Sequence, residues 1–141
     1  RIAFCCGNEA AVQALGMVKN NLDSGQFAAV QDAAIAALSG DQQCVADLCA
    51  LYRRRRDLVV EALRAIGLSC DAPRATIYVW AKVPAGETSE SFATKLLVRA
   101  HVIVTPGSGY GPGGEGYVRI SLTTPDDRLL EAVRRIKETM A

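Results

Sequence analysis

The sequence has no excess of charge of one sign and no long hydrophobic run. Its 16 basic and 15 acidic side chains leave a formal net charge of +1, which argues against a protein that mainly coats nucleic acid or an anionic membrane. No apolar run approaches the roughly 18 residues of a membrane span, and the N-terminus lacks the layout of a signal peptide. We therefore expect a cytoplasmic protein that binds neither nucleic acid nor membrane.

Histidine and paired cysteines are scarce as well. The five cysteines include one adjacent pair but no Cys-x-x-Cys, so the sequence suggests neither a disulfide framework nor a zinc site. His101 is the only histidine, and we predict no metal cluster and no Ser-His-Asp or Cys-His nucleophile. Because His101 stands beside the apolar run 102–104, it is expected to be a packing residue.

The sequence does contain enough apolar material for a core. Half of its 141 residues are hydrophobic and 22% are charged, which is typical of a globular domain and excludes intrinsic disorder. The chain opens on Arg1 without an initiator methionine, and the apolar run Ile2–Cys6 that follows is typical of a buried strand cut at its beginning. We therefore expect a piece of a longer protein.

Local patterns predict a succession of helices and strands. Helical spacing of apolar residues predicts five helices, over residues 8–20, 26–38, 41–66, 88–100 and 124–140. Alternation of apolar and polar residues predicts strands over residues 76–83 and 117–122, and the short apolar run at 102–105 predicts a third strand. Asn8 is expected to cap the first helix, Ser24 or Asp23 the second, and Gly67 to end the third.

Four consecutive arginines, Arg53 to Arg56, lie within the third predicted helix. One interpretation is a patch that binds phosphate or nucleic acid. The other is a solvated face on which Asp57 and Glu61 supply opposite charges about one turn away. Four consecutive helical residues fan around the whole circumference rather than forming one stripe, so we favour the solvated face.

The loop over residues 106–116 is the most unusual stretch. Gly109, Gly111 and Gly114 formally satisfy G-x-G-x-x-G, but a dinucleotide fingerprint requires a helix directly afterwards, and a strand is predicted here instead. No Gly-Lys-Ser/Thr is present for a phosphate-binding P-loop. Two interpretations remain open: a loop that approaches a ligand closely, and a plain hairpin connection.

Arg119 lies in the predicted strand 117–122. Alternation directs Val118, Ile120 and Leu122 to one face and Tyr117, Arg119 and Ser121 to the other. The apolar set belongs to the core, so Arg119 faces outward or into a cleft next to the glycine-rich loop. A guanidinium there can bind a carboxylate through two parallel hydrogen bonds, or it can be an ordinary solvated strand arginine.

Five segments in a fixed order carry a family resemblance. They are residues 1–4 (Arg-Ile-Ala-Phe), 20–25 (Asn-Asn-Leu-Asp-Ser-Gly), 73–80 (Pro-Arg-Ala-Thr-Ile-Tyr-Val-Trp), 105–111 (Thr-Pro-Gly-Ser-Gly-Tyr-Gly) and 114–121 (Gly-Glu-Gly-Tyr-Val-Arg-Ile-Ser). Together they resemble the C-terminal part of a class I/II, fold-type I aminotransferase, and within that superfamily the LL-diaminopimelate aminotransferase group. The resemblance covers essentially the whole chain.

The resemblance implies roles for a few residues. Arg119 matches the arginine that binds the substrate α-carboxylate, and Arg1 matches an arginine that contacts the phosphate group of pyridoxal 5'-phosphate. Asn20 and Asn21 fall at a turn that reaches the neighbouring subunit's active site in such homodimers, which makes Asn21 a substrate-binding candidate. The family's cofactor-bearing lysine lies upstream of Arg1. We therefore expect no catalytic residue in this chain, since none of its four lysines has that context: Lys19, Lys82, Lys95 and Lys137.

The resemblance also implies an α/β fold in two parts. Residues 1–39 correspond to the tail of the large cofactor-binding domain, and residues 40–141 to a small C-terminal domain with a mixed or antiparallel sheet covered by helices. The implied activity is transfer of an amino group between an amino acid, with LL-diaminopimelate as candidate, and a 2-oxo acid, using pyridoxal phosphate. The alternative is a non-catalytic α+β module for ligand sensing or subunit association.

Overall fold

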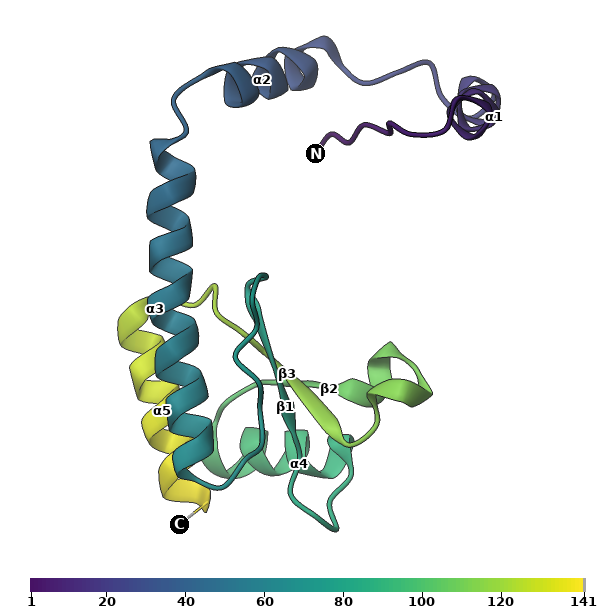
Figure 1. The fold of residues 1–141 in the computed structure, drawn as a ribbon. Coiled ribbons are helices and arrows are strands. Elements are labelled where there is room, and N and C mark those ends of the chain that lie inside the picture. Colours follow the sequence, from purple (N-terminus) through teal and green to yellow (C-terminus); the bar gives the residue numbers. More distant parts are fainter. Residues whose placement is uncertain (141) are drawn as a thin grey trace. The chain divides into compact units, whose positions relative to one another are not determined.

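The computed structural model describes residues 1–140. It divides into two compact units, Arg1–Val45 and the residues from Ala46 onward. In the first unit, helix α1 spans Glu9–Asn20 and helix α2 spans Ala28–Ser39 (Figure 1). The Asn8 side chain accepts a hydrogen bond from the Ala11 backbone N–H at 3.2 Å, which confirms the predicted cap of the first helix.

Two expectations for the first unit are wrong. The residue before α2 is Phe27, which makes no side-chain cap hydrogen bond, whereas Asp23 accepts a hydrogen bond from the Gly25 N–H and closes a local turn. Residues Ile2–Cys6 form no strand and are exposed. A strand requires a hydrogen-bonding neighbour, and the three strands found among residues 1–140 all lie in the second unit.

The first unit is expected to exchange its amide hydrogens at least about tenfold faster than strand Tyr78–Lys82 of the second unit. Helices α1 and α2 have 12 residues each and bury no residue, and helices this short are marginal in water without tertiary packing. Hydrogen exchange with mass spectrometry on the monomeric 141-residue chain is the measurement. Slower exchange in residues 1–39 of a verified monomer than in that strand contradicts the prediction.

The second unit contains a three-stranded antiparallel sheet. Its strands are β1 (Tyr78–Lys82), β2 (Thr105–Pro106) and β3 (Tyr117–Ser121), in the order β1-β3-β2. The predicted strand at 102–105 is therefore wrong for residues 102–104. Those residues instead connect the preceding helix to the sheet, beginning with a hydrogen bond from the Val102 N–H to the Leu96 carbonyl.

Three helices accompany the sheet. They are α3 (Gln43–Ala65), α4 (Ser89–Lys95, continued by a π-helical turn at Leu96–Ala100) and α5 (Asp126–Met140). All five predicted helices are thus present, with ends shifted by a few residues. Gly67 has a φ of +82° and ends α3 as predicted, since glycine adopts the left-handed conformation without a steric cost. Thr88 and Ser91 form a capping box at the start of α4.

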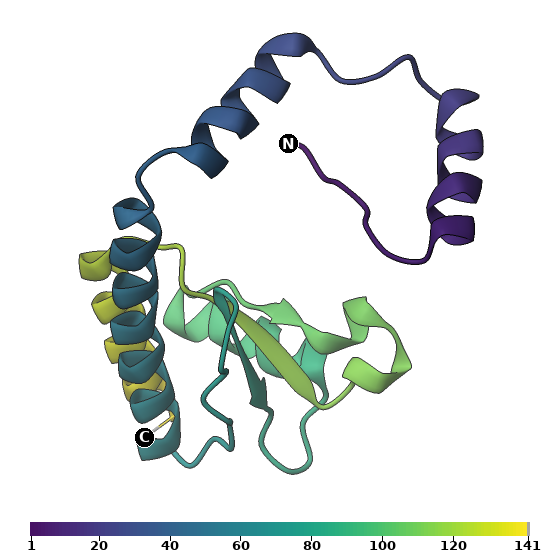
Figure 2. The same cartoon turned by 45° about the horizontal axis from the view of Figure 1, so that its top comes forward.

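The core lies between one face of the sheet and the helices. Its fully buried side chains include Phe92, Leu96, Leu122, Val59, Val79 and Val118. Both views place α3 and α5 side by side (Figures 1 and 2). His101 is exposed and adopts a left-handed backbone conformation after the π-helical turn. The prediction that it packs is therefore wrong, because its conformation ends a helix and turns the side chain to the surface.

The arginine run is only partly a solvated face. Arg56 pairs with Asp57 as expected. Arg54 and Arg55 instead pair with Asp126 at the start of α5, and the Arg55 side chain is only 12% exposed. Arg55 also donates a hydrogen bond to the Leu122 carbonyl at 3.0 Å. Arg54 and Arg55 therefore connect α3 to α5. Arg55 and Asp126 are 71 positions apart in the sequence.

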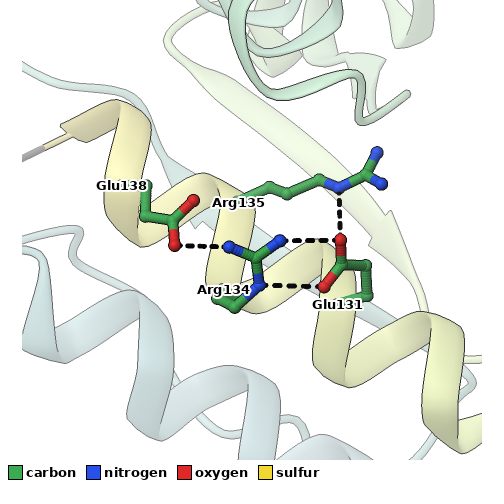
Figure 3. Close-up of polar contacts among 4 residues, drawn as sticks. All are labelled: Glu131, Arg134, Arg135 and Glu138. Atoms are coloured by element: carbon green, nitrogen blue, oxygen red, sulfur yellow. Dashed lines mark hydrogen bonds and ion pairs between the residues drawn. The ribbon is translucent and has the colours of Figure 1, made fainter.

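An ion-pair network covers the outer side of α5 (Figure 3). Glu131 accepts hydrogen bonds from Arg134 and Arg135, and Arg134 also bonds Glu138. Hydrogen bonds from Arg134 and then Arg135 lower the pKa of Glu131 to about 2. Because the charges neutralise one another at the surface, we assign this network to helix stabilisation rather than to a ligand site.

Within residues 1–140, no helix is both long and apolar enough to cross a membrane.

Candidate functional site

The sheet of the second unit has one face directed away from the core. Val79 and Ala81 of β1 and Val118 of β3 are fully buried, so strand alternation directs their neighbours to the opposite face. Arg119 lies on that face, directly opposite Trp80 on the adjacent strand. The predicted orientation of Arg119 is confirmed.

Arg119 lies among aromatic rings. Its Cζ atom is 4.1 Å from the centroid of the Tyr78 ring and 4.9 Å from that of the Tyr110 ring. Across residues 1–140, no carboxylate comes within ion-pair distance of its guanidinium. The predicted neighbour from the glycine-rich loop is thus confirmed in Tyr110, and the N–H donors of Arg119 are not engaged by an acid.

An open groove runs along this face. Residues that line it include Asp71, Thr76, Tyr78, Trp80, Gly113 and Arg119. Thr76 has a φ of +78°, a strained conformation for a β-branched residue. Backbone strain of this kind is concentrated at ligand-binding sites. The strained Thr76 therefore supports a functional role for the groove, and the sequence did not indicate it.

Further aromatic side chains pack against one another beside Arg119, on the same side of the sheet. The Trp80 ring stacks on the Tyr117 ring, with 5.6 Å between their centroids and an interplanar angle of 16°. It meets the Tyr110 ring edge-on, with 5.8 Å between their centroids. We did not predict this cluster. The signal was available, because the alternation that placed Arg119 also places Tyr78, Trp80 and Tyr117 on its face.

The glycine-rich loop folds closely upon itself. It forms two short 3-10 turns, Gly107–Tyr110 and Pro112–Gly114, and leads into β3, so no helix follows the formal G-x-G-x-x-G. A Cβ atom on Gly107 would lie 1.9 Å from the Gly114 carbonyl oxygen. Glycine is therefore required there by a backbone contact within the loop, and that contact holds the turn that carries Tyr110 beside Arg119.

A buried serine anchors this loop to the start of α4. The Ser89 N–H and hydroxyl donate hydrogen bonds to the two carboxylate oxygens of Glu115, each at 2.8 Å. The Ser89 oxygen also accepts a hydrogen bond from the Ser108 N–H at 3.3 Å. Hydrogen bonds from the Ser89 backbone, the Ser89 hydroxyl and the Gly116 backbone lower the pKa of Glu115 below its ordinary value of 4.5.

The Glu115 contacts are expected to make the second unit sensitive to acid. A carboxyl group whose pKa is lowered by folding stabilises the folded state above its unfolded pKa, and this contribution is lost as the pH falls through the folded pKa. The difference in unfolding free energy between wild type and Glu115→Gln should therefore be constant above about pH 6 and shrink below about pH 4.5. Denaturant unfolding across this range is the measurement.

Glu61→Gln, at an exposed position of α3, is the matched control, and its difference from wild type should stay small at every pH. A Glu115→Gln difference that does not change between pH 6 and pH 3 contradicts the prediction.

The other two predicted site residues lie in the first unit. Arg1 is exposed, and no hydrogen bond or ion pair occupies it within the described part of the chain. The Asn21 side-chain amide donates a 2.7 Å hydrogen bond to the Met17 carbonyl and closes the end of α1. Their roles toward cofactor and substrate stay predictions.

Comparison of the sequence with models of known protein families identifies the family. Residues 1–136 match the model for aminotransferase class I and II. The chain belongs to this family. It is 56% identical over 137 residues to LL-diaminopimelate aminotransferase of Desulforudis audaxviator, a match that covers 97% of this chain and 35% of that protein. It is 52% identical over 136 residues to LL-diaminopimelate aminotransferase of Dehalococcoides mccartyi, with 96% of this chain and 35% of that protein covered. The chain thus spans about a third of the length of these relatives.

Solved aminotransferase structures share the fold. A probable N-succinyldiaminopimelate aminotransferase from Thermus thermophilus matches with a TM-score of 0.87 and 40% identity, covering 94% of this chain and 36% of that one. Substrate-bound BacF from Bacillus subtilis matches with a TM-score of 0.85 and 39% identity, covering 94% of this chain and 34% of that one. The predicted aminotransferase family and α/β fold class are therefore confirmed.

Proposed function

We propose that this chain is part of a pyridoxal phosphate-dependent aminotransferase that moves an amino group between an amino acid and a 2-oxo acid. Arg119 carries the proposal: it lies in an open groove of an aminotransferase-family chain, and no carboxylate of the described residues engages its guanidinium. The names of the relatives support LL-diaminopimelate as the amino donor and thus a role in lysine biosynthesis.

The task proposed for Arg119 is to bind and orient the substrate. A planar guanidinium donates two parallel hydrogen bonds to a carboxylate, which fixes its orientation as well as its position. Holding the α-carboxylate in this way restricts rotation of the substrate and aligns the Cα–H bond for proton removal. Asn21 is proposed as a further substrate contact.

The arginines present fit the charges of cofactor and substrate. Arg1 has an exposed guanidinium without an acid partner in the described chain, and this donor type suits a phosphate group. Bound pyridoxal phosphate supplies an electron sink for the reacting carbon. We propose that Arg1 holds its phosphate and that the proton-transferring lysine belongs to a part of the enzyme outside this chain.

A homodimer in the cytoplasm is the proposed assembly, with the turn at Asn20 and Asn21 directed to the neighbouring subunit. Large apolar side chains of the first unit are exposed, among them Leu22 at 78% and Phe27 at 76%. Exposed apolar surface of this kind favours association. The non-catalytic module is the less favoured function, because the relatives are named as enzymes.

The activity is tested with the complete protein that contains this chain. Its absorbance spectrum with pyridoxal phosphate is recorded, and amino donors including LL-diaminopimelate are then added with a panel of 2-oxo acids. We expect a donor-dependent spectral change and transfer of the amino group to the 2-oxo acid. A spectrum that no amino donor alters, together with no transfer, contradicts the proposal.

The 141-residue chain alone is expected to show no transamination and no specific covalent attachment of pyridoxal phosphate, because none of its lysines has the family's context. Borohydride reduction in the presence of the cofactor, followed by mass mapping, is the measurement. Scattered labelling of exposed lysines is compatible with this expectation. Stoichiometric labelling of one lysine together with turnover contradicts it.

A further inference from the structure

The two tyrosines beside Arg119 come from separate elements. Tyr78 lies on β1, where it is paired with Ser121 and is therefore one step diagonal from Arg119 on the same face of the sheet. Tyr110 ends the first 3-10 turn of the glycine-rich loop. The guanidinium carbon lies over both rings, at 4.1 Å and 4.9 Å from their centroids, which is within the range of a cation–π interaction.

These contacts differ in kind from an ion pair. An aromatic ring attracts a cation through the negative face of its π-system, whereas a carboxylate binds the N–H donors of a guanidinium. The rings can therefore hold Arg119 in one conformation without occupying the groups that a ligand carboxylate needs. A neighbouring acid would occupy those same donors, and none lies within ion-pair distance in the described residues.

Neighbouring groups restrain Tyr110, and the sheet sets the backbone position of Tyr78. Tyr110 meets the edge of Trp80, which itself stacks on Tyr117, and the loop of Tyr110 is fastened to α4 through Ser89 and Glu115. Tyr78 is fixed by its place in β1, between the fully buried Val79 and the strained Thr76 segment. The contacts of Tyr110 and the strand position of Tyr78 are thus set by the fold, independently of any ligand.

We propose that Tyr78 and Tyr110 are positioning residues that hold the Arg119 guanidinium ready for a carboxylate by contacting it through their ring faces. This inference rests on the proposed function for the identity of the ligand, the α-carboxylate of an amino acid. It adds to that function the means by which Arg119 is kept in place while its donors remain available.

The first experiment uses the 141-residue chain and acetate as the carboxylate probe. Binding is followed at the Arg119 side-chain Nε–Hε signal by NMR in wild type and in Tyr78→Leu, Tyr78→Phe, Tyr110→Leu and Tyr110→Phe. We expect each leucine variant to weaken acetate binding by about 3- to 30-fold and each phenylalanine variant to stay within about twofold of wild type. The phenylalanine variants keep the ring, so they separate the ring from the hydroxyl.

Tyr52→Leu is the matched control. Tyr52 contacts a different arginine, Arg55, whose Cζ lies 5.8 Å from the ring centroid, so its loss should leave acetate binding at Arg119 unchanged. Leucine variants that bind acetate as well as wild type, phenylalanine variants as weak as leucine ones, or a wild-type Arg119 that does not respond to acetate would each overturn the proposal.

The second experiment places the same variants in the complete protein. Tyr78→Leu should raise KM for the amino acid more than it lowers kcat, and in an Arg119→Lys background it should add less than about twofold, because the ring acts through the guanidinium. Equal effects in both backgrounds overturn the proposal. If the complete protein transfers no amino group but the acetate results hold, the proposed function fails and the positioning role stands.

Discussion

Replacing Arg119 with lysine is expected to lower kcat/KM for the amino donor by about 10- to 150-fold in the complete enzyme. Lysine keeps the charge but loses the planar fork that makes two parallel hydrogen bonds to a carboxylate. Hydrogen bonds to charged groups contribute about 1.5–3 kcal/mol, which sets this range. Steady-state kinetics with a fixed 2-oxo acid are the measurement.

Arg128→Lys provides the control for this change. Arg128 is an exposed arginine of α5, and its replacement should alter kcat/KM by less than about twofold. Thermal unfolding of both variants separates a loss of binding from a loss of folding. An Arg119→Lys enzyme that is folded and has the wild-type kcat/KM shows that the fork does not bind the substrate, and the site assignment is then withdrawn.

Gly107→Ala is expected to destabilise the second unit by about 3 kcal/mol, the upper end of the usual cost of overpacking. The added Cβ would lie 1.9 Å from the Gly114 carbonyl oxygen and 2.7 Å from the Tyr117 carbonyl oxygen. Both obstacles are backbone atoms, so no side-chain rotation relieves the clash. The loop must open, and opening removes Tyr110 from its place beside Arg119. Denaturant unfolding of the 141-residue chain measures the loss.

The same loop offers a matched control in Gly109. A Cβ atom there meets nothing within 4 Å, and the residue does not have a positive φ, so Gly109→Ala should change the unfolding free energy by no more than about 0.5 kcal/mol. Equal effects at positions 107 and 109 contradict the assignment of the close contact between Gly107 and Gly114.

Sequence reasoning succeeded where neighbouring residues decide the outcome. The cap at Asn8, the end of α3 at Gly67 and the outward orientation of Arg119 each depend on a few consecutive positions. The ordered segments also identified the family, since they preserve residue types at fixed places along the chain. Arg119 was therefore predictable, from the amino-acid sequence alone, as a candidate residue for binding a carboxylate.

Sequence reasoning failed where partners from distant segments decide the outcome. Ile2–Cys6 has the composition of a strand, yet no strand of its unit pairs with it. Arg55 looked like one arginine of a solvated run, but folding brings Asp126 to it. His101 is a different case, because its left-handed conformation is a local helix end that the adjoining apolar residues did not indicate.

The sequence by itself determined the helices, the strand faces and the family, because periodicity, capping and motifs are local properties of the chain. Only the tertiary structure decided which rings contact the Arg119 guanidinium. Tyr78 and Tyr110 stand 41 and 9 positions before it, and they meet its guanidinium because β1 pairs with β3 and because Gly107 and Gly114 let the loop close. Such contacts follow from strand register and backbone packing, which no short stretch of sequence encodes.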